Sequence, residues 1–456
     1  MAPPEPSQAI QRLHAMPLDV LEPQIASGDL SEDLRAIVGP TLATELEQMA
    51  RTSVAGVLAA EERPLVVILP GITGSLLFNT VGDTGLIWLN PLALLAGKLP
   101  LLRLDPTGRR DALPGVQIVA SGLLPTHYLL IQIHLRALGG CDVLGFPFDW
   151  RRALAPAVDS LRRLVLGQFR QTGRKLHLVG HSMGGLVARD FCLRYPADAA
   201  RAVAQVIQLG TPNYGSCESV RNLTTGGDTA ELVVKLNPAN APLPLLRTFP
   251  GLYAMLPAPQ ECYPADAPFP YPYAVDLAIY DASAYGIDDL SATHLAAARA
   301  GYEWRATAAQ PPVPITIIAG YDVPTCLGFT MRRSTGGSGF DFTAAVAQDG
   351  DGTVPLASAT ALPGATRLYG RGLKHGDLPL YGVVRDAVLD LIHGRPPSGL
   401  ESAPHSGVLG FAAPSVGVPE HPVPGTLSPS ELDAIAERIR NGQATPEDLQ
   451  VLAGGH

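Results

Sequence analysis

Cysteine is scarce in this sequence, which holds five cysteines in 456 residues. Their number is odd, and none are spaced as C-x-x-C, so neither a disulfide framework nor a cysteine-based zinc site is indicated. No H-E-x-x-H motif or cluster of His and Asp ligands is present either, and we expect neither a metal nor a cofactor. Reduced thiols in the core or in loops are expected at Cys141, Cys192, Cys217, Cys262 and Cys326.

Charge and long apolar runs are also limited. Only 16% of the residues are charged, the net charge is −9 and no basic block is present, which argues against a nucleic-acid partner. No apolar run approaches the roughly 20 residues of a transmembrane helix. The N-terminus has no basic region followed by an apolar one, so we expect a cytoplasmic protein, although removal of a leader would leave the same sequence. With 46% hydrophobic residues, the chain is expected to form a well-packed globular domain.

The most informative stretch is the run from Lys175 to Arg189. It reads as a short apolar strand, then Gly-x-Ser-x-Gly at Gly180, Ser182 and Gly184, then a helical pattern. This is the pattern of a nucleophile elbow, in which a sharp strand-to-helix turn exposes a serine hydroxyl. We expect Ser182 to have a strained backbone, and the flanking glycines to avoid clashes with the neighbouring strand and helix. The alternative is a Gly-rich turn that contains a serine by chance.

The elbow predicts an α/β-hydrolase fold: a mostly parallel sheet flanked by helices, with a large cap insertion and short helical extensions at both ends. Apolar runs consistent with buried strands are found at 64–69, 141–148, 202–209, 315–320 and 365–369, whereas 76–130 reads as loop-rich. The expected organisation is a helical extension over 1–60, a catalytic domain over 61–395 with a cap at 213–312, a Pro-rich linker over 396–427 and a helical tail over 428–456.

A serine nucleophile needs a base, usually a histidine held by a carboxylate, and in this fold the chain order is serine, acid, histidine. His375 follows a predicted strand and precedes the last helix of the domain, which is the expected place for the base. His294, inside the predicted cap, and His393, at the end of a helix, are the alternatives.

The carboxylate candidate is Asp351, in the loop Asp349–Pro355, with Asp349 as its rival two residues upstream. For the oxyanion hole we expect the backbone N–H groups of Ile72, in the loop after the first strand, and of Met183, after the serine. A plain strand-to-loop turn explains residues 70–75 equally well.

At this point the sequence resembles the lecithin:cholesterol acyltransferase family, which includes phospholipase/transacylases and many bacterial relatives. The resemblance spans about residues 64–395 and rests on motifs in a fixed order: Pro70-Gly71 with Gly74-Ser75, Asp149-Trp150-Arg151, Gly180 to Gly185, Gly210-Thr211-Pro212, Phe249-Pro250 with Met255-Leu256-Pro257, and Gly350 to Pro355. We interpret Asp149-Trp150-Arg151 as structural, a packed ring beside a charge pair at a strand end, with a functional role as the alternative.

The resemblance implies a Ser182, Asp351 and His375 triad, an oxyanion hole from Ile72 and Met183, and a small-molecule or lipid ester as substrate. The chain departs from secreted animal members, which have a disulfide-closed lipid-binding loop after the first strand; here 71–140 holds no cysteine. Peripheral contact with lipid is compatible with the sequence but does not follow from it.

The leading hypothesis is a carboxylic-ester hydrolase that acts through an acyl-serine intermediate. An acyltransferase that delivers the acyl group to an alcohol is the first alternative, because its chemistry up to the acyl-enzyme is identical. A catalytically silent hydrolase fold used for binding is the second. A metal-dependent hydrolase lacks its ligand motifs.

Overall fold

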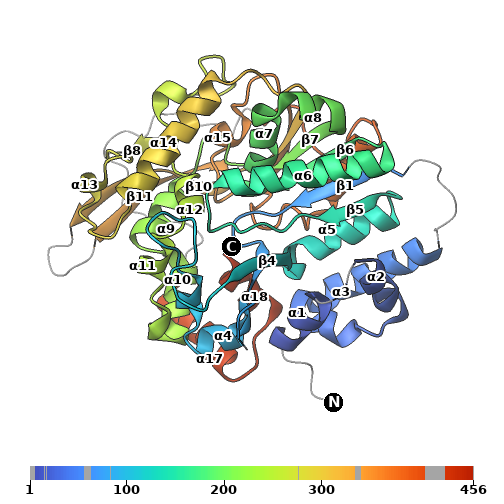
Figure 1. Cartoon of the computed structure of the whole chain (residues 1–456), viewed down its shortest axis with the longest axis horizontal. Coiled ribbons are helices and arrows are strands. Elements are labelled where there is room, and N and C mark those ends of the chain that lie inside the picture. The colour runs from blue at the N-terminus through green and yellow to red at the C-terminus, as the bar shows by residue number, and fades with distance from the viewer. Residues whose placement is uncertain are drawn as a thin grey trace.

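The computed structural model describes residues 6–405, with gaps at 15, 17, 56–62, 83, 276 and 334–339, and residues 427–454. Its centre is a six-stranded parallel sheet with the strand order β12-β9-β7-β6-β1-β5 (Figure 1). The strands are β1 (Leu65–Leu69), β5 (Asp142–Gly145), β6 (Leu176–His181), β7 (Val203–Leu209), β9 (Ile315–Tyr321) and β12 (Thr366–Arg371). All five strand segments expected from the sequence are in this sheet, together with the elbow strand.

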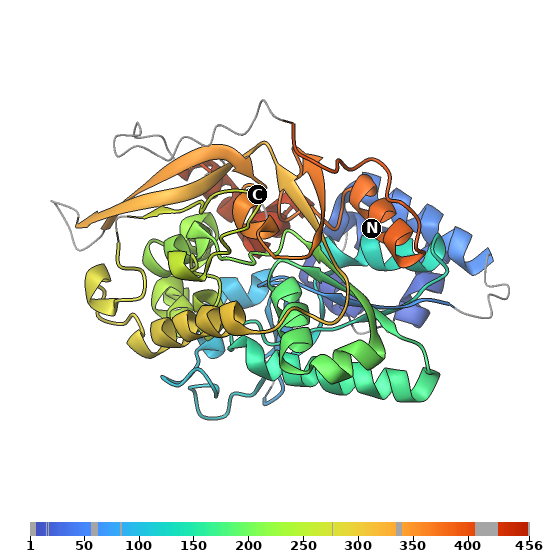
Figure 2. The same ribbon diagram turned by 90° about the horizontal axis from the view of Figure 1, so that it is seen from above.

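The central strands are apolar on both faces, as parallel strands covered by helices must be. Every residue of β1 and of β9 is buried. Helices α6, α7 and α8 lie on one side of the sheet, whereas α5 and α16 pack together on the other (Figure 2). The helices that flank the sheet or follow its strands are α5 (Pro125–Ala137), α6 (Leu154–Thr172), α7 (Met183–Arg194), α8 (Pro196–Ala202), α15 (Leu356–Thr360) and α16 (Gly382–Ile392).

Two smaller sheets were not anticipated. The expectation of a loop-rich segment at 76–130 is wrong in part, because an antiparallel sheet of order β3-β2-β4 forms there. A long antiparallel hairpin also follows β9, with a short parallel strand beside it. The bounds are β2 (Ser75–Asn79), β3 (Gly85–Trp88), β4 (Ile118–Leu123), β8 (Ala274–Val275), β10 (Val323–Arg333) and β11 (Phe340–Gly350), and the helical pieces between β3 and β4 are α4 (Pro91–Leu95) and η1 (Leu99–Leu102).

The predicted cap, residues 213–312, is here called the cap segment. It folds mainly into short helices, three of which begin at a proline that is preorganised for the first helical turn. Its elements are α9 (Cys217–Thr224), α10 (Gly227–Leu236), η2 (Pro238–Asn240), α11 (Pro242–Leu246), α12 (Pro250–Tyr253), η3 (Gln260–Cys262), α13 (Ala282–Tyr285) and α14 (Ala292–Thr307), together with β8.

The N-terminal extension packs on the side of the sheet that carries α5 and α16. Its helices are α1 (Pro6–His14), α2 (Leu18–Ser27) and α3 (Ser31–Ala55). The last of these breaks at Gly39, just before Pro40, because proline cannot continue the hydrogen bonding of a helix. Glu22 pairs with Arg136 of α5 at 2.7 Å, and Glu45 pairs with Arg385 of α16 at 2.5 Å. These contacts fix the extension to the hydrolase domain.

At the C-terminal end the chain forms α17 (Pro429–Arg440) and α18 (Pro446–Ala453), each opened by a capping box. Ser428 with Glu431 and Thr445 with Asp448 make these boxes, within the helical tail that the sequence predicts. Most of the predicted linker, residues 406–426, lies outside the described residues.

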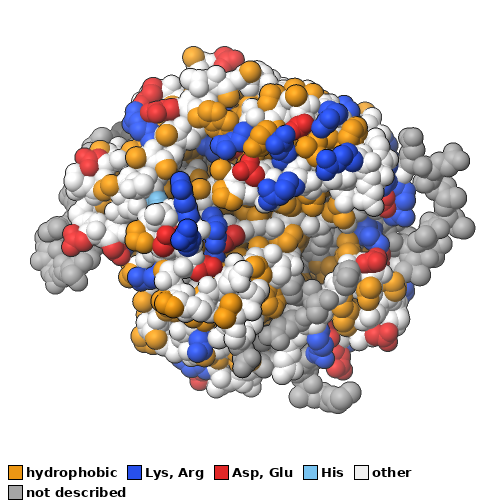
Figure 3. Space-filling model, viewed as in Figure 1, with side chains coloured by type: hydrophobic (Ala, Val, Ile, Leu, Met, Phe, Trp, Pro, Cys, Tyr) orange, Lys and Arg blue, Asp and Glu red, His pale blue; other side chains and the backbone are white. Residues whose placement is uncertain are grey.

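The surface carries charge of mixed sign, with basic and acidic side chains interspersed on the face in Figure 3. In the described parts of the chain, no helix combines the length and the hydropathy needed to cross a bilayer.

A buried arginine fixes the end of β5. The Arg151 side chain is fully buried and pairs with Asp149 at 2.7 Å and Asp111 at 2.9 Å. It also donates to the Leu102 carbonyl, while its own carbonyl accepts from Gly251 N in the cap segment. The charge pair expected between Asp149 and Arg151 is thus present, and it joins the strand end to two loops.

We predict that Arg151→Met lowers the free energy of unfolding by about 3 kcal/mol, because it removes the fully buried cation of a charge cluster and leaves Asp111 and Asp149 with Arg152 as their remaining partner. Urea unfolding followed by circular dichroism measures this. Arg163→Met, on the outer part of α6, serves as the control and should change stability by less than about 0.5 kcal/mol. An Arg151 variant as stable as the control would contradict the role assigned to this cluster.

Candidate active site

Ser182 lies at a sharp turn between β6 and α7, with φ 52° and ψ −123°. A Cβ on Gly180 would lie 2.6 Å from the Cα of Gly185, and one on Gly184 would lie 2.3 Å from the Leu69 carbonyl oxygen. Both distances are too short for any side chain, so the glycines allow the turn to press against β1 and against its own helix. The strained serine and the close packing are those of the predicted elbow.

The structure brings Ser182, His375 and Asp351 into one hydrogen-bonded line. His375 Nε2 lies 3.0 Å from Ser182 Oγ, and its Nδ1 lies 2.7 Å from Asp351 Oδ2. His375 also donates its backbone N–H to the Asp351 carbonyl at 2.8 Å, which holds the two loops together. The ring can thus accept the serine proton at Nε2 while Nδ1–H stays bound to the carboxylate.

Of the two candidate acids, Asp351 is the one that meets the histidine. Its second oxygen, Oδ1, accepts from Thr353 N at 3.1 Å and from Val354 N at 2.7 Å, which fixes the carboxylate plane. Asp349 lies in β11, with its Oδ1 buried and without a hydrogen-bond partner. Burial raises the pKa of Asp349 to about 7.

The two alternative histidines have other partners. His393 lies 2.9 Å from the Gly139 carbonyl through its Nε2, and His294 packs its ring against Tyr253 in the cap segment. Neither of them contacts Ser182 in the structure, so His375 is the candidate base that the geometry supports.

The predicted oxyanion hole remains a prediction, although the two backbone segments are well placed for it. A Cβ on Gly71 would lie 3.0 Å from Ser182 Cβ, so the loop after β1 runs directly beside the serine. Ile72 lines the cavity above Ser182, and Met183 is the first residue of α7, where backbone N–H groups lack helical partners.

A buried network behind the serine was not predicted from the sequence. The Gly71 N–H donates to Tyr128 Oη at 2.8 Å, and that hydroxyl lies 2.8 Å from His181 Nδ1. His181 Nε2 lies 3.0 Å from the His375 carbonyl oxygen. The chain of contacts therefore runs from the loop beside the serine to the backbone of the base.

The directions of these hydrogen bonds follow from the donors available. Burial lowers the pKa of His181 well below its ordinary value, so its ring is neutral and carries one proton. A carbonyl can only accept, which places that proton on Nε2 and makes Nδ1 an acceptor from Tyr128. Tyr128 then donates to His181 and accepts from Gly71. His181 stands between Gly180 and Ser182 in the elbow motif, so the sequence shows that it lies near the nucleophile. No local pattern predicts its contact with Tyr128.

The serine opens into a cavity of about 440 Å³. One wall is a row of aromatic rings: Trp88 and Trp150 have centroids 5.7 Å apart, and Trp150 and Phe249 have centroids 5.8 Å apart. Trp150 is therefore more than the structural ring expected from the sequence, since it also lines the site. Other apolar lining residues come from the cap segment and the loops near it: Leu99, Leu124, Val233, Leu245, Leu246, Leu252 and Met255.

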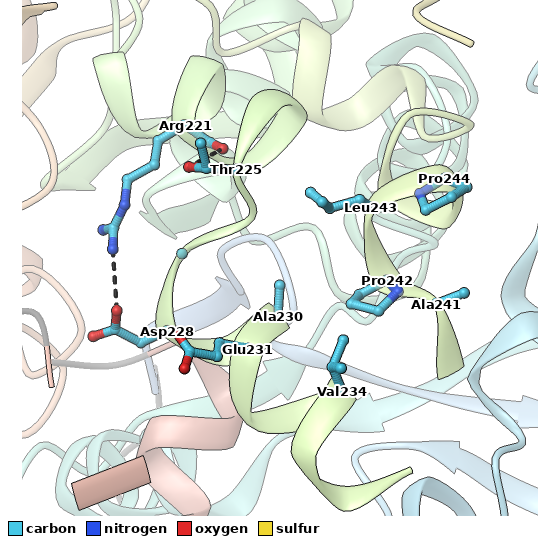
Figure 4. A pocket seen from close by; sticks show the side chains of 11 residues that line it. Arg221, Thr225, Asp228, Ala230, Glu231, Val234, Ala241, Pro242, Leu243 and Pro244 are labelled. Atoms are coloured by element: carbon cyan, nitrogen blue, oxygen red, sulfur yellow. Dashed lines mark hydrogen bonds and ion pairs between the residues drawn. The ribbon is translucent and has the colours of Figure 1, made fainter. Parts of the chain in front are cut away.

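The far end of the cavity is polar. Arg221 of α9 pairs with Glu218 at 3.3 Å and with Asp228 of α10 at 3.1 Å. The Arg221–Asp228 pair also borders a second hollow of about 470 Å³ between α9, α10 and α11 (Figure 4). Among the described residues, no three His, Cys, Asp or Glu side chains are grouped to hold a metal ion.

We predict that Tyr128→Phe lowers kcat for ester cleavage about 5- to 30-fold with little change in KM. The variant removes both hydrogen bonds of the hydroxyl, each worth about 0.5–1.5 kcal/mol, and so loosens the loop beside Ser182. Tyr285→Phe is the matched control, since Tyr285 is a buried tyrosine of the cap segment that donates to Ile279 O at 2.8 Å. If kcat fell equally in the two variants, Tyr128 would have no specific role in positioning the loop beside Ser182.

We predict that Asp351→Asn lowers kcat by about four orders of magnitude, because an amide there favours the wrong histidine tautomer. Asp349→Asn should leave kcat within a few fold of the wild type. Steady-state kinetics on one ester compares the two variants, and an inactive Asp349 variant would reassign the acid.

The Asp349 variant should also change how stability depends on pH. The folded pKa of Asp349, about 7, lies above the ordinary value of an aspartate, so its stabilising contribution is complete below the unfolded pKa and is lost as the pH rises to about 7. Asparagine is neutral throughout, so Asp349→Asn should gain Tm relative to the wild type between pH 5 and pH 8.

Parts of the chain are similar in sequence to a known protein family and to curated proteins. Residues 138–287 match the family model described as lecithin:cholesterol acyltransferase. The curated protein "Lysosomal phospholipase A and acyltransferase" of Homo sapiens is 34% identical over 91 residues, which are 19% of this chain and 22% of that protein. Its counterpart from Canis lupus familiaris is 32% identical over 100 residues, 21% of this chain and 24% of that protein. The chain thus matches less than a quarter of the length of these relatives.

Among solved structures, the Tle4–Tli4 complex matches with a TM-score of 0.49 and 14% identity, covering 74% of this chain and 99% of that one. The mature Bacillus licheniformis lipase BlEst2 matches with a TM-score of 0.38 and 14% identity, covering 74% and 94%. The fold assignment rests on the parallel sheet and the elbow themselves. The chain is an α/β-hydrolase that is similar, over residues 138–287, to the lecithin:cholesterol acyltransferase family that its ordered motifs resemble.

Proposed function

We propose that this protein cleaves carboxylic esters of apolar acyl chains through an acyl-Ser182 intermediate. The observation that carries the proposal is the line from Ser182 through His375 to Asp351, with contacts of 3.0 and 2.7 Å, at the floor of an apolar cavity. The match to the lecithin:cholesterol acyltransferase model supports an acyl ester as the substrate class.

In the first half-reaction, Ser182 Oγ attacks the ester carbonyl carbon while His375 Nε2 takes the hydroxyl proton. Asp351 keeps Nδ1–H in place and stabilises the imidazolium that forms. The carbonyl oxygen becomes an oxyanion beside Ile72 and Met183, whose N–H groups would stabilise it. His375 then gives its proton to the leaving alcohol as the C–O bond breaks, and the acyl group stays on Ser182.

In the second half-reaction, His375 takes a proton from water, whose oxygen attacks the acyl carbon. The Ser182 ester bond breaks, the serine regains its proton from His375, and a free carboxylic acid leaves. An alcohol in place of the water gives a new ester by the same steps. The relatives named as phospholipase A and acyltransferase favour this second candidate outcome.

The cavity supports a fatty rather than a short acyl chain. Its walls beside Ser182 are two tryptophans, Phe249 and aliphatic side chains, mostly from the cap segment. Each methylene transferred from water to such a wall contributes about 0.8 kcal/mol, so extending an acyl chain from two to eight carbons can contribute up to about 5 kcal/mol. A catalytically silent fold would bind such an ester without cleaving it. The ester kinetics described next distinguish this alternative from the proposed hydrolase.

We predict that the wild-type protein hydrolyses p-nitrophenyl esters with a kcat/KM that rises from C2 to medium or long chains, and that Ser182→Ala lowers kcat by about a millionfold. Intact-mass measurement after exposure to a fluorophosphonate should show one adduct on the wild type and none on Ser182→Ala. Circular dichroism checks that both proteins are folded.

The results distinguish the alternatives. A kcat/KM that falls beyond C4 would make the protein a short-chain esterase. Absence of both the adduct and turnover would favour the binding module, whereas ester products formed with an added alcohol would favour the acyltransferase.

A further inference from the structure

The C-terminal helix α18 ends at the catalytic cavity. Ala453 and Gly454 line that cavity together with residues of the elbow and of the cap segment. The Ala453 carbonyl lies 2.8 Å from Thr73 Oγ1, and Thr73 is the residue after the predicted oxyanion donor Ile72. A helix about 270 residues away in sequence from the elbow therefore contacts the loop beside the nucleophile.

The same segment is fixed along α10 of the cap segment. Thr229 Oγ1 donates to the Val451 carbonyl at 2.9 Å, and Lys235 pairs with Asp433 at 2.8 Å. Arg440 donates to the Lys235 carbonyl at 2.6 Å. These contacts run from the cavity end of α10 to its far end, so the tail spans the whole helix.

Apolar burial holds the two tail helices in place. The side chains of Leu449 and Leu452 on α18 are fully buried, as is Leu432 on α17. Arg438 of α17 pairs with Asp448 of α18, which ties the two helices to each other. Burying three leucines gives the tail a defined position, because removing apolar side chains from water favours the packed state.

Thr73 is held from several directions. Its φ of 63° is a left-handed conformation that a β-branched residue rarely adopts. Trp88 Nε1 donates to its carbonyl at 2.8 Å, while its hydroxyl lies within 2.5 Å of the Ile72 carbonyl and within 2.8 Å of the Ala453 carbonyl. Because the strain at Thr73 needs support from its surroundings, the end of α18 contributes to the shape of the loop that faces the oxyanion.

We propose that α18 is a specificity-determining element of the ester site: Ala453 closes one end of the acyl cavity, and the Ala453 carbonyl positions Thr73 and with it Ile72. This inference rests on the proposed function, because it assigns the walls of the same site. It makes the C-terminal helices part of the substrate-binding structure and not an appendage to it.

The wall is tested with Ala453→Phe in the full chain, assayed on C4 to C12 p-nitrophenyl esters. A ring at this position takes up cavity space, so the ratio of kcat/KM for C12 to that for C4 should fall. Losing room for two methylene groups corresponds to about a 15-fold fall. Glu447→Phe places the same ring on the exposed first turn of α18 and should keep the wild-type ratio.

Positioning is tested with Thr73→Val and Thr73→Ser. Valine keeps the branched shape and loses the hydroxyl, so kcat should fall about tenfold with KM little changed. Serine keeps the hydroxyl and should restore kcat to within about threefold of the wild type. A structural role alone would affect both variants alike, or would change thermal stability instead of kcat.

Fluorophosphonate labelling separates this inference from the proposed function. A wild-type protein that neither reacts with the probe nor turns over esters would contradict the function itself. If Ala453→Phe is folded and labelled but its C12 to C4 ratio of kcat/KM is unchanged, Ala453 does not close the acyl cavity. If phenylalanine prevents folding, Ala453→Val replaces it and is expected to shift the ratio in the same direction by a smaller factor, an unchanged ratio again being decisive.

Discussion

The contact between the serine turn and the loop after β1 is the constraint on which the site depends. Gly184 lies so close to the Leu69 carbonyl, and Gly71 so close to Ser182, that no side chain fits at Gly184 and little room remains at Gly71. This approach places the start of α7 beside the Gly71–Ile72 backbone. Close backbone packing therefore fixes the loop that carries the predicted oxyanion donor Ile72 relative to the start of α7, where the second predicted donor, Met183, lies.

The buried network complements this packing electrostatically. The His181 and His375 rings have centroids 5.1 Å apart, so a charge on His181 would oppose the imidazolium that forms on His375 during the reaction. Burial keeps His181 neutral, as its lowered pKa indicates. Its single ring N–H, at Nε2, donates a hydrogen bond to the His375 carbonyl oxygen. His181 can thus hold the base in place without competing for its positive charge, which leaves Asp351 as the carboxylate bound to that ring.

Local patterns were sufficient to predict much of this structure. The elbow, the apolar strands and the capped C-terminal helices each depend on residues that are close in sequence, and the order of serine, acid and base follows from the fold. The hairpin β10–β11 was missed, because its antiparallel pairing is set by the partner strand as much as by its own residues. The Tyr128–His181 contact and the seat of α18 on Thr73 join residues 53 and 380 positions apart, and no local pattern encodes such contacts.

The chemistry of the cavity indicates which part of a substrate the protein can discriminate. At its polar end Arg221 is already paired with both Glu218 and Asp228, and a charged head group bound there would have to break these pairs to gain its own. Burial raises the pKa of Glu218, which further weakens it as a fixed anion for a cationic ligand. An acyl chain that packs on the apolar walls breaks no ion pair, and each additional methylene that it buries contributes further binding free energy. Under the proposed function, discrimination should therefore be stronger among acyl chains than among head groups bound at this end, and the residues that set the length of the cavity, including Ala453, should matter more than Arg221 and its partners.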